Sequence, residues 1–447
     1  MKVLSAVVFI IVVAAFRRFL RVAGVGAAYK AKALCSALFV SGLELDPNTA
    51  DEVSAGAYRL MRLFPARVDR DAKSVTASFF GLRARTARFR PGLGAALEFR
   101  PLPPAPIFPP FPSIEPSLPW PEGEKASPRP SSSLARIVDA AFTEPNPKKL
   151  RRTRAVVIVK DGRLLAERYA PGFTASTPLN GWSMTKSAMG ALIGTLIGAG
   201  RLSLADKNLL AEWNGDPRAE IALEDLLRMR GGLRFGEVYA DPLSDVTRML
   251  FDGPDAGGFA ASRPLAHAPG SHWQYASGTS NILSLIARRT LGEADYPFWP
   301  RRALFDPLGM RSAVLETDAS GTFVGSSFLF ATARDWARFG ELHRLDGVWA
   351  GRRILPEGWV TLVTTPTPQA PNERYGAHWW LKLSKDLGGE TAAAKKLPPD
   401  AFHALGHEGQ CVSVIPSRGL VVVRLGLSID ITAWDHAAFL ACVLDAV

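Results

Sequence analysis

The sequence has few cysteines: only Cys35, Cys411 and Cys442 occur among its 447 residues. An odd number of cysteines at long spacings does not form a disulfide framework, so a packed core has to hold the chain together. Hydrophobic residues make up 47% of the chain, which is enough to build one large and one small folded unit.

Several motifs that would assign the chain to other enzyme classes are missing. There is no His-Glu-x-x-His, and the seven histidines show no ligand spacing, so no metal site is expected. There is neither a Walker loop nor a Gly-x-Gly-x-x-Gly after a strand, and we therefore expect no nucleotide cofactor. The nucleophile elbow Gly-x-Ser-x-Gly is also absent, because Thr185 stands where its second glycine would be.

Charge is sparse and mostly positive. Charged residues make up 21% of the chain, and the formal net charge is +11 at pH 7. The arginines are scattered rather than gathered with aromatic side chains, and no nucleic-acid-binding module is recognisable. Nucleic acid is therefore not an expected partner.

Long apolar runs are also scarce, and only the N-terminal one suggests contact with a membrane. Residues 3–16 form an apolar stretch that is shorter than the roughly 20 residues of a comfortable bilayer span. Residues 1–30 are therefore predicted to be a signal peptide, or a signal anchor if the helix continues past Arg17 and Arg18. Because these arginines follow the apolar stretch, the positive-inside rule alone would leave the rest of the protein in the cytoplasm.

Composition divides the chain into four predicted segments. After residues 1–30, residues 31–100 are predicted to be a small N-terminal segment with short strands, and residues 101–132 are dense in proline. Proline lacks an N–H and fixes φ, so the third segment is predicted to be an extended linker or a wrapping arm. A ligand for a proline-recognising module is the alternative. Residues 133–447 form the predicted main domain.

The main domain is predicted to be α+β. It opens with two strand-like runs, 155–160 and 163–169, joined by an Asp-Gly pair that is typical of a hairpin turn. Helix-type patterns fill its middle, and strand patterns return at 411–427 before a final helical segment at 434–447. This order predicts an antiparallel β-sheet flanked by helices, with a helical lobe.

The most informative stretch is Ser183 to Lys186, which reads Ser-x-x-Lys at the start of an apolar, helix-forming run. On a helix, positions i and i+3 share a face, so the Lys186 ammonium can reach the Ser183 hydroxyl. Serine becomes a good nucleophile when a base takes its proton, and burial can lower the pKa of a lysine enough for that task. By itself, however, the tetrapeptide fits an ordinary helix start with a solvated lysine better.

Two further stretches complete the candidate site. Residues 273–281 form a polar loop with one tyrosine, Tyr275, ahead of an amphipathic helical pattern. Residues 406–410 place His407 and Gly409 next to an apolar strand pattern. The chain thus carries Ser-x-x-Lys, Tyr-x-Ser and His-x-Gly in that order.

This ordered set resembles the serine β-lactamase and penicillin-binding-protein superfamily. The branch that it looks closest to is the class C-like hydrolases, which include carboxylesterases and 6-aminohexanoate-dimer hydrolases. The resemblance covers roughly residues 133–447, and it implies the α+β fold predicted above. Enzymes of this kind usually act outside the cytoplasmic membrane. We therefore expect a membrane-tethered protein whose catalytic domain is periplasmic or otherwise extracytoplasmic.

The resemblance also implies an acyl-enzyme mechanism. Ser183 would be the nucleophile, and the backbone N–H groups of Ser183 and Gln410 would form the oxyanion hole. Lys186 is the first candidate for the base. Tyr275 is the second candidate, and it would also relay the proton to the leaving group.

Three residues are predicted to contact substrate by the same resemblance: His407, Gly409 and Tyr239. Tyr239 either closes over the substrate or is a half-buried surface tyrosine, and His407 either binds substrate or caps its strand. His407 stands where class C β-lactamases have the lysine of Lys-Thr-Gly, so a fixed positive charge is missing. A small amide or ester is therefore the expected substrate. The alternatives are a D-amino-acid peptidase or penicillin-recognising protein, and a non-catalytic envelope scaffold.

Overall fold

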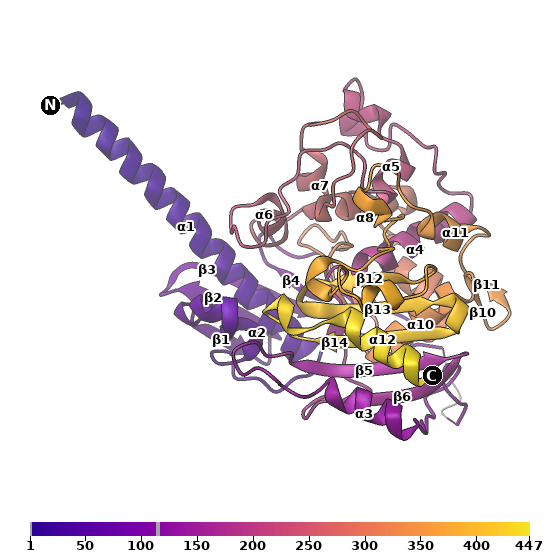
Figure 1. Cartoon of the computed structure of the whole chain (residues 1–447). Helices are drawn as coiled ribbons and strands as arrows, with labels where there is room; N and C mark the ends of the chain where they lie inside the picture. Colours follow the sequence, from indigo (N-terminus) through magenta and orange to yellow (C-terminus); the bar gives the residue numbers. More distant parts are fainter. Residues whose placement is uncertain (1, 113–116) are drawn as a thin grey trace.

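The computed structural model describes residues 2–112 and 117–447 (Figure 1). At its centre is a five-stranded antiparallel sheet with the strand order β12-β13-β14-β5-β6. Two strands come from the start of the main domain and three from its end, and β14 pairs with β5 to join the two sets. The strands are β5 (Thr153–Lys160), β6 (Arg163–Tyr169), β12 (Phe402–Gly406), β13 (Gln410–Ile415) and β14 (Leu420–Gly426).

Both faces of this sheet are covered by helices, which explains why its central strands are almost entirely apolar. In β5, Val156 and Ile158 face a core formed with α3 (Ser132–Ala140) and α12 (His436–Ala446). The alternate residues Val157 and Val159 face the opposite core, to which α10 (Ala333–Arg344) contributes. The predicted mixture of helices with an antiparallel sheet, and the predicted hairpin, are confirmed.

A helical lobe lies beside the sheet, as predicted (Figure 1). Two of its helices are almost fully buried and pack against each other. They begin at the Ser-x-x-Lys and Tyr-x-Ser motifs, so the packing of the lobe places the two motifs near each other. The helices are α4 (Met184–Gly198), α5 (Leu223–Leu227), α6 (Asp245–Phe251), α7 (Ala256–Ala261) and α8 (Ser277–Leu291).

Helix α1 (Lys2–Phe39) is one continuous helix whose halves have different surroundings. From Ala23 onward its apolar side chains are buried against a second sheet, with the strand order β1-β2-β3-β4. Its first half projects away from the body, and Phe9 and Ile10 are 69% and 65% exposed (Figure 1). The strands of this sheet are β1 (Ala66–Asp69), β2 (Ser74–Phe79), β3 (Leu82–Arg90) and β4 (Gly94–Leu97).

The membrane anchor predicted within residues 1–30 is not supported. In the parts of the chain that the structure describes, no helix is both long enough and apolar enough to cross a membrane. Arg17, Arg18 and Arg21 end the apolar stretch after residue 16, and the same helix then continues into the packed fold.

The described parts of the proline-rich segment lie against the main domain. The ring of Phe108 packs on Phe298, with their centroids 5.2 Å apart. Trp120 is buried, and the Arg338 guanidinium lies 5.8 Å from the centroid of its ring. The described parts of this segment therefore run along the main domain as an arm. Their backbone does not form a regular helix or sheet there, and aromatic and cationic side chains hold it in place.

A buried ion pair joins α1 to the main domain. The Lys32 ammonium pairs with the Glu316 carboxylate, and both side chains are almost inaccessible to solvent. Glu316 also accepts hydrogen bonds from Ser36 Oγ at 2.9 Å and from the backbone N–H of Ala95 at 2.7 Å. One carboxylate of the main domain therefore fastens both α1 and β4.

We expect Glu316→Ala to lower the free energy of unfolding by about 3–5 kcal/mol, because it leaves a buried lysine without its partner. Urea denaturation followed by circular dichroism would measure the change. Glu357→Ala is the matched control at an exposed glutamate, and it should change stability by less than about 0.5 kcal/mol. Equal urea midpoints for the two variants would contradict this role of the ion pair.

Candidate active site

Ser183 stands at the start of α4, directly after a tight turn. The turn follows β7 (Leu179–Asn180), and Trp182 adopts a left-handed conformation with φ +48°. A Cβ on Gly181 would lie 2.3 Å from Cζ2 of Trp336, so only glycine fits there. The Ser183 side chain makes no capping hydrogen bond to the helix, and its hydroxyl is therefore available for other partners.

Lys186 lies one helical turn further on and points at Ser183. Its Nζ donates to Ser183 Oγ at 2.8 Å and to the backbone oxygen of Ser326 at 3.0 Å. The residue is only 1% exposed, and burial lowers the pKa of Lys186 to about 8, although the Glu237 carboxylate acts in the opposite direction. An appreciable fraction of this lysine is consequently neutral near neutral pH.

Tyr275 completes a group of three around the same point. The Lys186 ammonium lies 4.9 Å from the centroid of the Tyr275 ring. Burial, reinforced by the charge of Glu237, raises the pKa of Tyr275 above its ordinary value, while a hydrogen bond with Ser183 lowers it. Its phenol is therefore protonated in the resting protein. The structure thus brings together three residues that the sequence analysis selected from two separate motifs.

The turn that carries His407 and Gly409 joins β12 to β13, at the edge of the sheet. Glu408 and Gly409 both have positive φ, at +62° and +81°. Arg424 Nη1 holds this turn by donating to the backbone oxygens of Glu408 at 3.1 Å and Gly409 at 2.9 Å. The turn is therefore fixed by a buried guanidinium before the chain enters β13 at Gln410.

A close backbone approach brings this turn to Ser183. A Cβ on Gly406 would lie 2.2 Å from the backbone oxygen of Gly181, so the glycine at 406 lets the two segments touch. The Gln410 side chain forms two hydrogen bonds with the backbone of Gly426, at 2.6 and 2.9 Å. The start of β13 and the start of α4 are consequently held side by side.

The predicted substrate residues Tyr239 and His407 stack on each other. Their ring centroids are 5.4 Å apart with an interplanar angle of 14°. The Trp182 ring meets His407 edge-on at 5.6 Å, and Trp182 directly precedes Ser183. Tyr239 therefore belongs to an aromatic cluster beside Ser183, rather than standing alone at the surface.

Glu237 is a site residue that the sequence analysis missed. Its carboxylate accepts from the backbone N–H of Ser277 at 2.8 Å, from Ser277 Oγ at 2.5 Å and from the Tyr239 hydroxyl at 3.4 Å. Burial raises the pKa of Glu237, and the Lys186 charge lowers it. The available signal was its place two residues before Tyr239, but nothing in the local pattern indicated that this carboxylate meets the serine of the Tyr-x-Ser motif.

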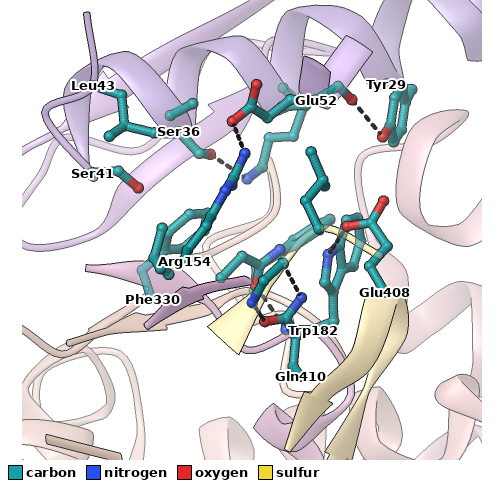
Figure 2. A pocket seen from close by; sticks show the side chains of 18 of the residues that line it. Tyr29, Ser36, Ser41, Leu43, Glu52, Arg154, Trp182, Phe330, Glu408 and Gln410 are labelled. Atoms are coloured by element: carbon teal, nitrogen blue, oxygen red, sulfur yellow. Dashed lines mark hydrogen bonds and ion pairs between the residues drawn. The ribbon is translucent and has the colours of Figure 1, made fainter. Parts of the chain in front are cut away.

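A cavity of about 80 Å³ adjoins the site from the side of α1 (Figure 2). Ser183, Lys186 and Tyr275 are not among its lining residues, so it lies beside the turn before α4 and not at these three side chains. Among its lining residues are Trp182, Glu408 and Gln410 from the main domain and Tyr29, Ser36 and Glu52 from the N-terminal segment.

Metal binding finds no support in the described residues. Across 2–112 and 117–447, no group of three or more His, Cys, Asp or Glu side chains is placed to hold a metal ion. What gathers around Ser183 is a lysine, tyrosines and a histidine, a set suited to moving protons.

Comparison with known proteins gives a consistent result. Residues 138–426 match the family model described as Beta-lactamase. The 6-aminohexanoate-dimer hydrolase of Paenarthrobacter ureafaciens is 27% identical over 299 residues, which cover 61% of this chain and 72% of that protein.

Two solved structures share the fold. One is a Bacillus anthracis protein assigned as a 6-aminohexanoate-dimer hydrolase, with a TM-score of 0.56 and 23% identity over 70% of this chain and 80% of that one. The other is EstCE1, a hydrolase with promiscuous acyltransferase activity, with a TM-score of 0.53 and 17% identity over 70% of this chain and 98% of that one. At these identities the likeness concerns the fold alone.

We expect Gly409→Ala to be more destabilising than Gly172→Ala, although both glycines have positive φ, at +81° and +83°. A Cβ at Gly409 would lie 2.7 Å from Arg424 Nη1, whereas a Cβ at Gly172 meets no atom within 4 Å. Gly172→Ala should cost only backbone strain, about 1–2 kcal/mol. Gly409→Ala should cost at least about 1.5 kcal/mol more, since it disturbs a charged hydrogen bond. Urea denaturation would compare them, and equal losses would refute the contact.

Proposed function

The chain belongs to the beta-lactamase family, and on that premise we propose that it is a serine hydrolase that cleaves a small amide or ester through an acyl-enzyme on Ser183. The observation that carries the proposal is the 2.8 Å contact between Lys186 Nζ and Ser183 Oγ, made by a lysine whose pKa is lowered by burial. A hydroxyl in contact with a base of this kind is an activated nucleophile.

In the proposed acylation, Ser183 Oγ attacks the carbonyl carbon of the substrate. A C–O bond forms, the π electrons of the carbonyl move onto its oxygen, and the hydroxyl proton passes to Lys186 Nζ. When the carbonyl re-forms, the bond to the leaving alcohol or amine breaks. The leaving group takes that proton by way of Tyr275, whose phenol is protonated and lies next to both residues.

Deacylation is proposed to use the same groups in reverse. Water gives a proton to the lysine–tyrosine pair as it attacks the acyl-enzyme, and Ser183 Oγ leaves with a proton from that pair. In both acylation and deacylation, the negatively charged oxygen of the tetrahedral intermediate would accept hydrogen bonds from the backbone N–H groups of Ser183 and Gln410. The contact between Gly181 and Gly406 brings the two segments that carry these groups together. Each such donor is typically worth about 3 kcal/mol of transition-state stabilisation.

The charges around the site support amides and esters over β-lactams as substrates. By resemblance His407 takes the place of a lysine that would bind a β-lactam carboxylate, so the fixed positive charge for such a group is missing. The Paenarthrobacter relative is named as a 6-aminohexanoate-dimer hydrolase, and EstCE1 as a hydrolase with promiscuous acyltransferase activity. Both names agree with a hydrolase, and that of EstCE1 also with acyl transfer.

We predict that a fluorophosphonate probe labels the full-length protein once and that Ser183→Ala abolishes the label. Intact-mass spectrometry would detect the adduct. Turnover of p-nitrophenyl acetate should fall by a factor of about 10⁴ or more in Ser183→Ala. Lys186→Ala should be nearly inactive, and Lys186→Arg should be as poor because arginine does not give up its proton.

Two outcomes would count against the proposal. One is a folded wild-type protein that takes no label and hydrolyses neither esters nor amides, which would favour a non-catalytic scaffold. The other is an adduct that persists in Ser183→Ala, which would place the reactive group elsewhere. Circular dichroism of each variant controls for loss of the fold.

The lowered pKa of Lys186 predicts how the rate depends on pH. If neutral Lys186 is the base, kcat/KM for a non-ionising ester rises with pH through an apparent pKa near 8 and then levels off. The value belongs to the coupled lysine–tyrosine pair, so one midpoint describes both residues. A pH–rate profile from pH 6 to 9.5, with Ser183→Ala as the blank for spontaneous hydrolysis, would measure it.

Glu237→Gln is the matched variant for this profile. The Glu237 carboxylate raises the pKa of Lys186, so its neutralisation should move the midpoint to lower pH while glutamine keeps the size of the side chain. A midpoint that does not move, or that moves to higher pH, would show that Lys186 is not the group that titrates.

A further inference from the structure

The N-terminal segment places one tyrosine against the candidate site. Tyr58 belongs to a short 3₁₀ helix, Gly56–Leu63, in which no residue is fully buried. Its hydroxyl donates to Glu408 Oε1 at 2.8 Å and lies 3.2 Å from His407 Nε2. In this otherwise surface-exposed turn, Tyr58 is thus directed at the two residues that precede Gly409.

Helix α1 supports the Tyr58 ring from behind. Tyr29 stacks on Tyr58 with ring centroids 5.2 Å apart and an interplanar angle of 23°. The Tyr29 hydroxyl donates to the backbone oxygen of Glu52 at 3.2 Å, and the Lys32–Glu316 pair holds the same helix to the main domain. Burial, together with the neighbouring Tyr29 and Glu408, raises the pKa of Tyr58, so its hydroxyl remains a donor.

Tyr58, His407 and Tyr239 form a row along one side of the site. Tyr58 touches one edge of the His407 ring, and Tyr239 stacks on its face. At the far end the Tyr239 hydroxyl lies 3.5 Å from Ser277 Oγ, at the start of the helix that follows Tyr275. The row therefore runs from the N-terminal segment to the helical lobe and closes that side of the site with aromatic rings.

The wall formed by Tyr58, His407 and Tyr239 is fixed in place. Glu408, which accepts from Tyr58, also accepts from Trp182 Nε1 at 3.2 Å, and Arg424 holds the Glu408 backbone oxygen. Moving the Tyr58 ring aside would leave a buried carboxylate with fewer donors, which is costly. The Tyr58 ring is consequently held in place beside His407.

Tyr58 also lies outside the part of the chain that the family model matches, which begins at residue 138. Tyr58 is therefore an addition by this chain's own N-terminal segment to a wall whose other two residues, His407 and Tyr239, lie within the matched region. A side chain contributed in this way is well placed to make the selectivity of one protein differ from that of its relatives.

We propose that Tyr58 sets the length of substrate that the site accepts, so that the group lying along His407 is a short one. This inference rests on the proposed hydrolase function. It identifies the substrate class as short-chain esters or amides. The chemistry at Ser183 does not require Tyr58, so selectivity and activity are separable.

The test measures kcat/KM of the full-length protein for p-nitrophenyl acetate, butyrate and octanoate. Wild type should prefer acetate or butyrate. Tyr58→Ala should raise the octanoate-to-acetate ratio by about tenfold or more, because a pocket that gains room for methylenes discriminates by factors of this size. Tyr58→Phe keeps the ring and loses only the hydroxyl, so it should keep a ratio close to that of wild type.

Leu60→Ala is the matched control, since Leu60 belongs to the same 3₁₀ helix but is 62% exposed. It should leave all three rates unchanged. Tyr58→Trp tests the wall in the opposite direction and should lower the ratio, so the proposal stays testable if Tyr58→Ala does not fold.

The outcomes separate the two proposals. If wild type hydrolyses acetate but neither Tyr58→Ala nor Tyr58→Trp changes the ratio, the wall is refuted while the hydrolase stands. A ratio that changes equally in Leu60→Ala also refutes it, because the effect would then belong to the segment as a whole. If folded wild type hydrolyses none of the esters and takes no fluorophosphonate label, both proposals fail.

Discussion

The burial of the Lys186 ammonium against Ser183 is the interaction on which the rest of the site depends. A lysine in the protein interior is stable only if it is largely neutral or well paired, and its partners here are a serine hydroxyl and one backbone oxygen. Because α4 is buried along almost its whole length, the lysine cannot turn toward solvent to escape this environment. The fold therefore places an amine of lowered pKa within hydrogen-bond distance of a serine hydroxyl, and the nearby Glu237 carboxylate raises that pKa in part.

Small residues and one guanidinium determine how precisely the site is assembled. Gly406 lets the turn before α4 touch the edge of the sheet, because a side chain there would meet the backbone oxygen of Gly181, and Gly181 leaves room for the Trp336 ring. Arg424 then fixes the turn through Glu408 and Gly409 by donating to backbone oxygens. These contacts are made by backbone or by buried side chains on the sheet. The approach of the sheet edge to the turn before Ser183 thus rests on backbone and buried side chains.

The N-terminal segment is part of the same structure rather than a separate appendage. Its long helix is half projecting and half buried, and the buried half is joined to the main domain by the Lys32–Glu316 pair (Figure 1). From that base it holds Tyr29 and Tyr58 against the His407 turn. A fold shared with other hydrolases is in this way extended by residues that the shared region does not contain.

Local spacing was enough to predict the features that arise within one element or one turn. Ser183 and Lys186 are three residues apart on a helix, and the hairpin of β5 and β6 follows from its Asp-Gly turn, so each was visible in a short window. The N-terminal apolar stretch was misleading for the same reason, since a short window does not show that its helix continues into the fold. Only the tertiary structure decided which distant residues meet: Glu237 with Ser277, and Tyr58 with His407. Such pairs depend on how whole helices and sheets pack against each other. The hydrophobic pattern of a segment shows that it packs, but it does not show which distant segment it packs against.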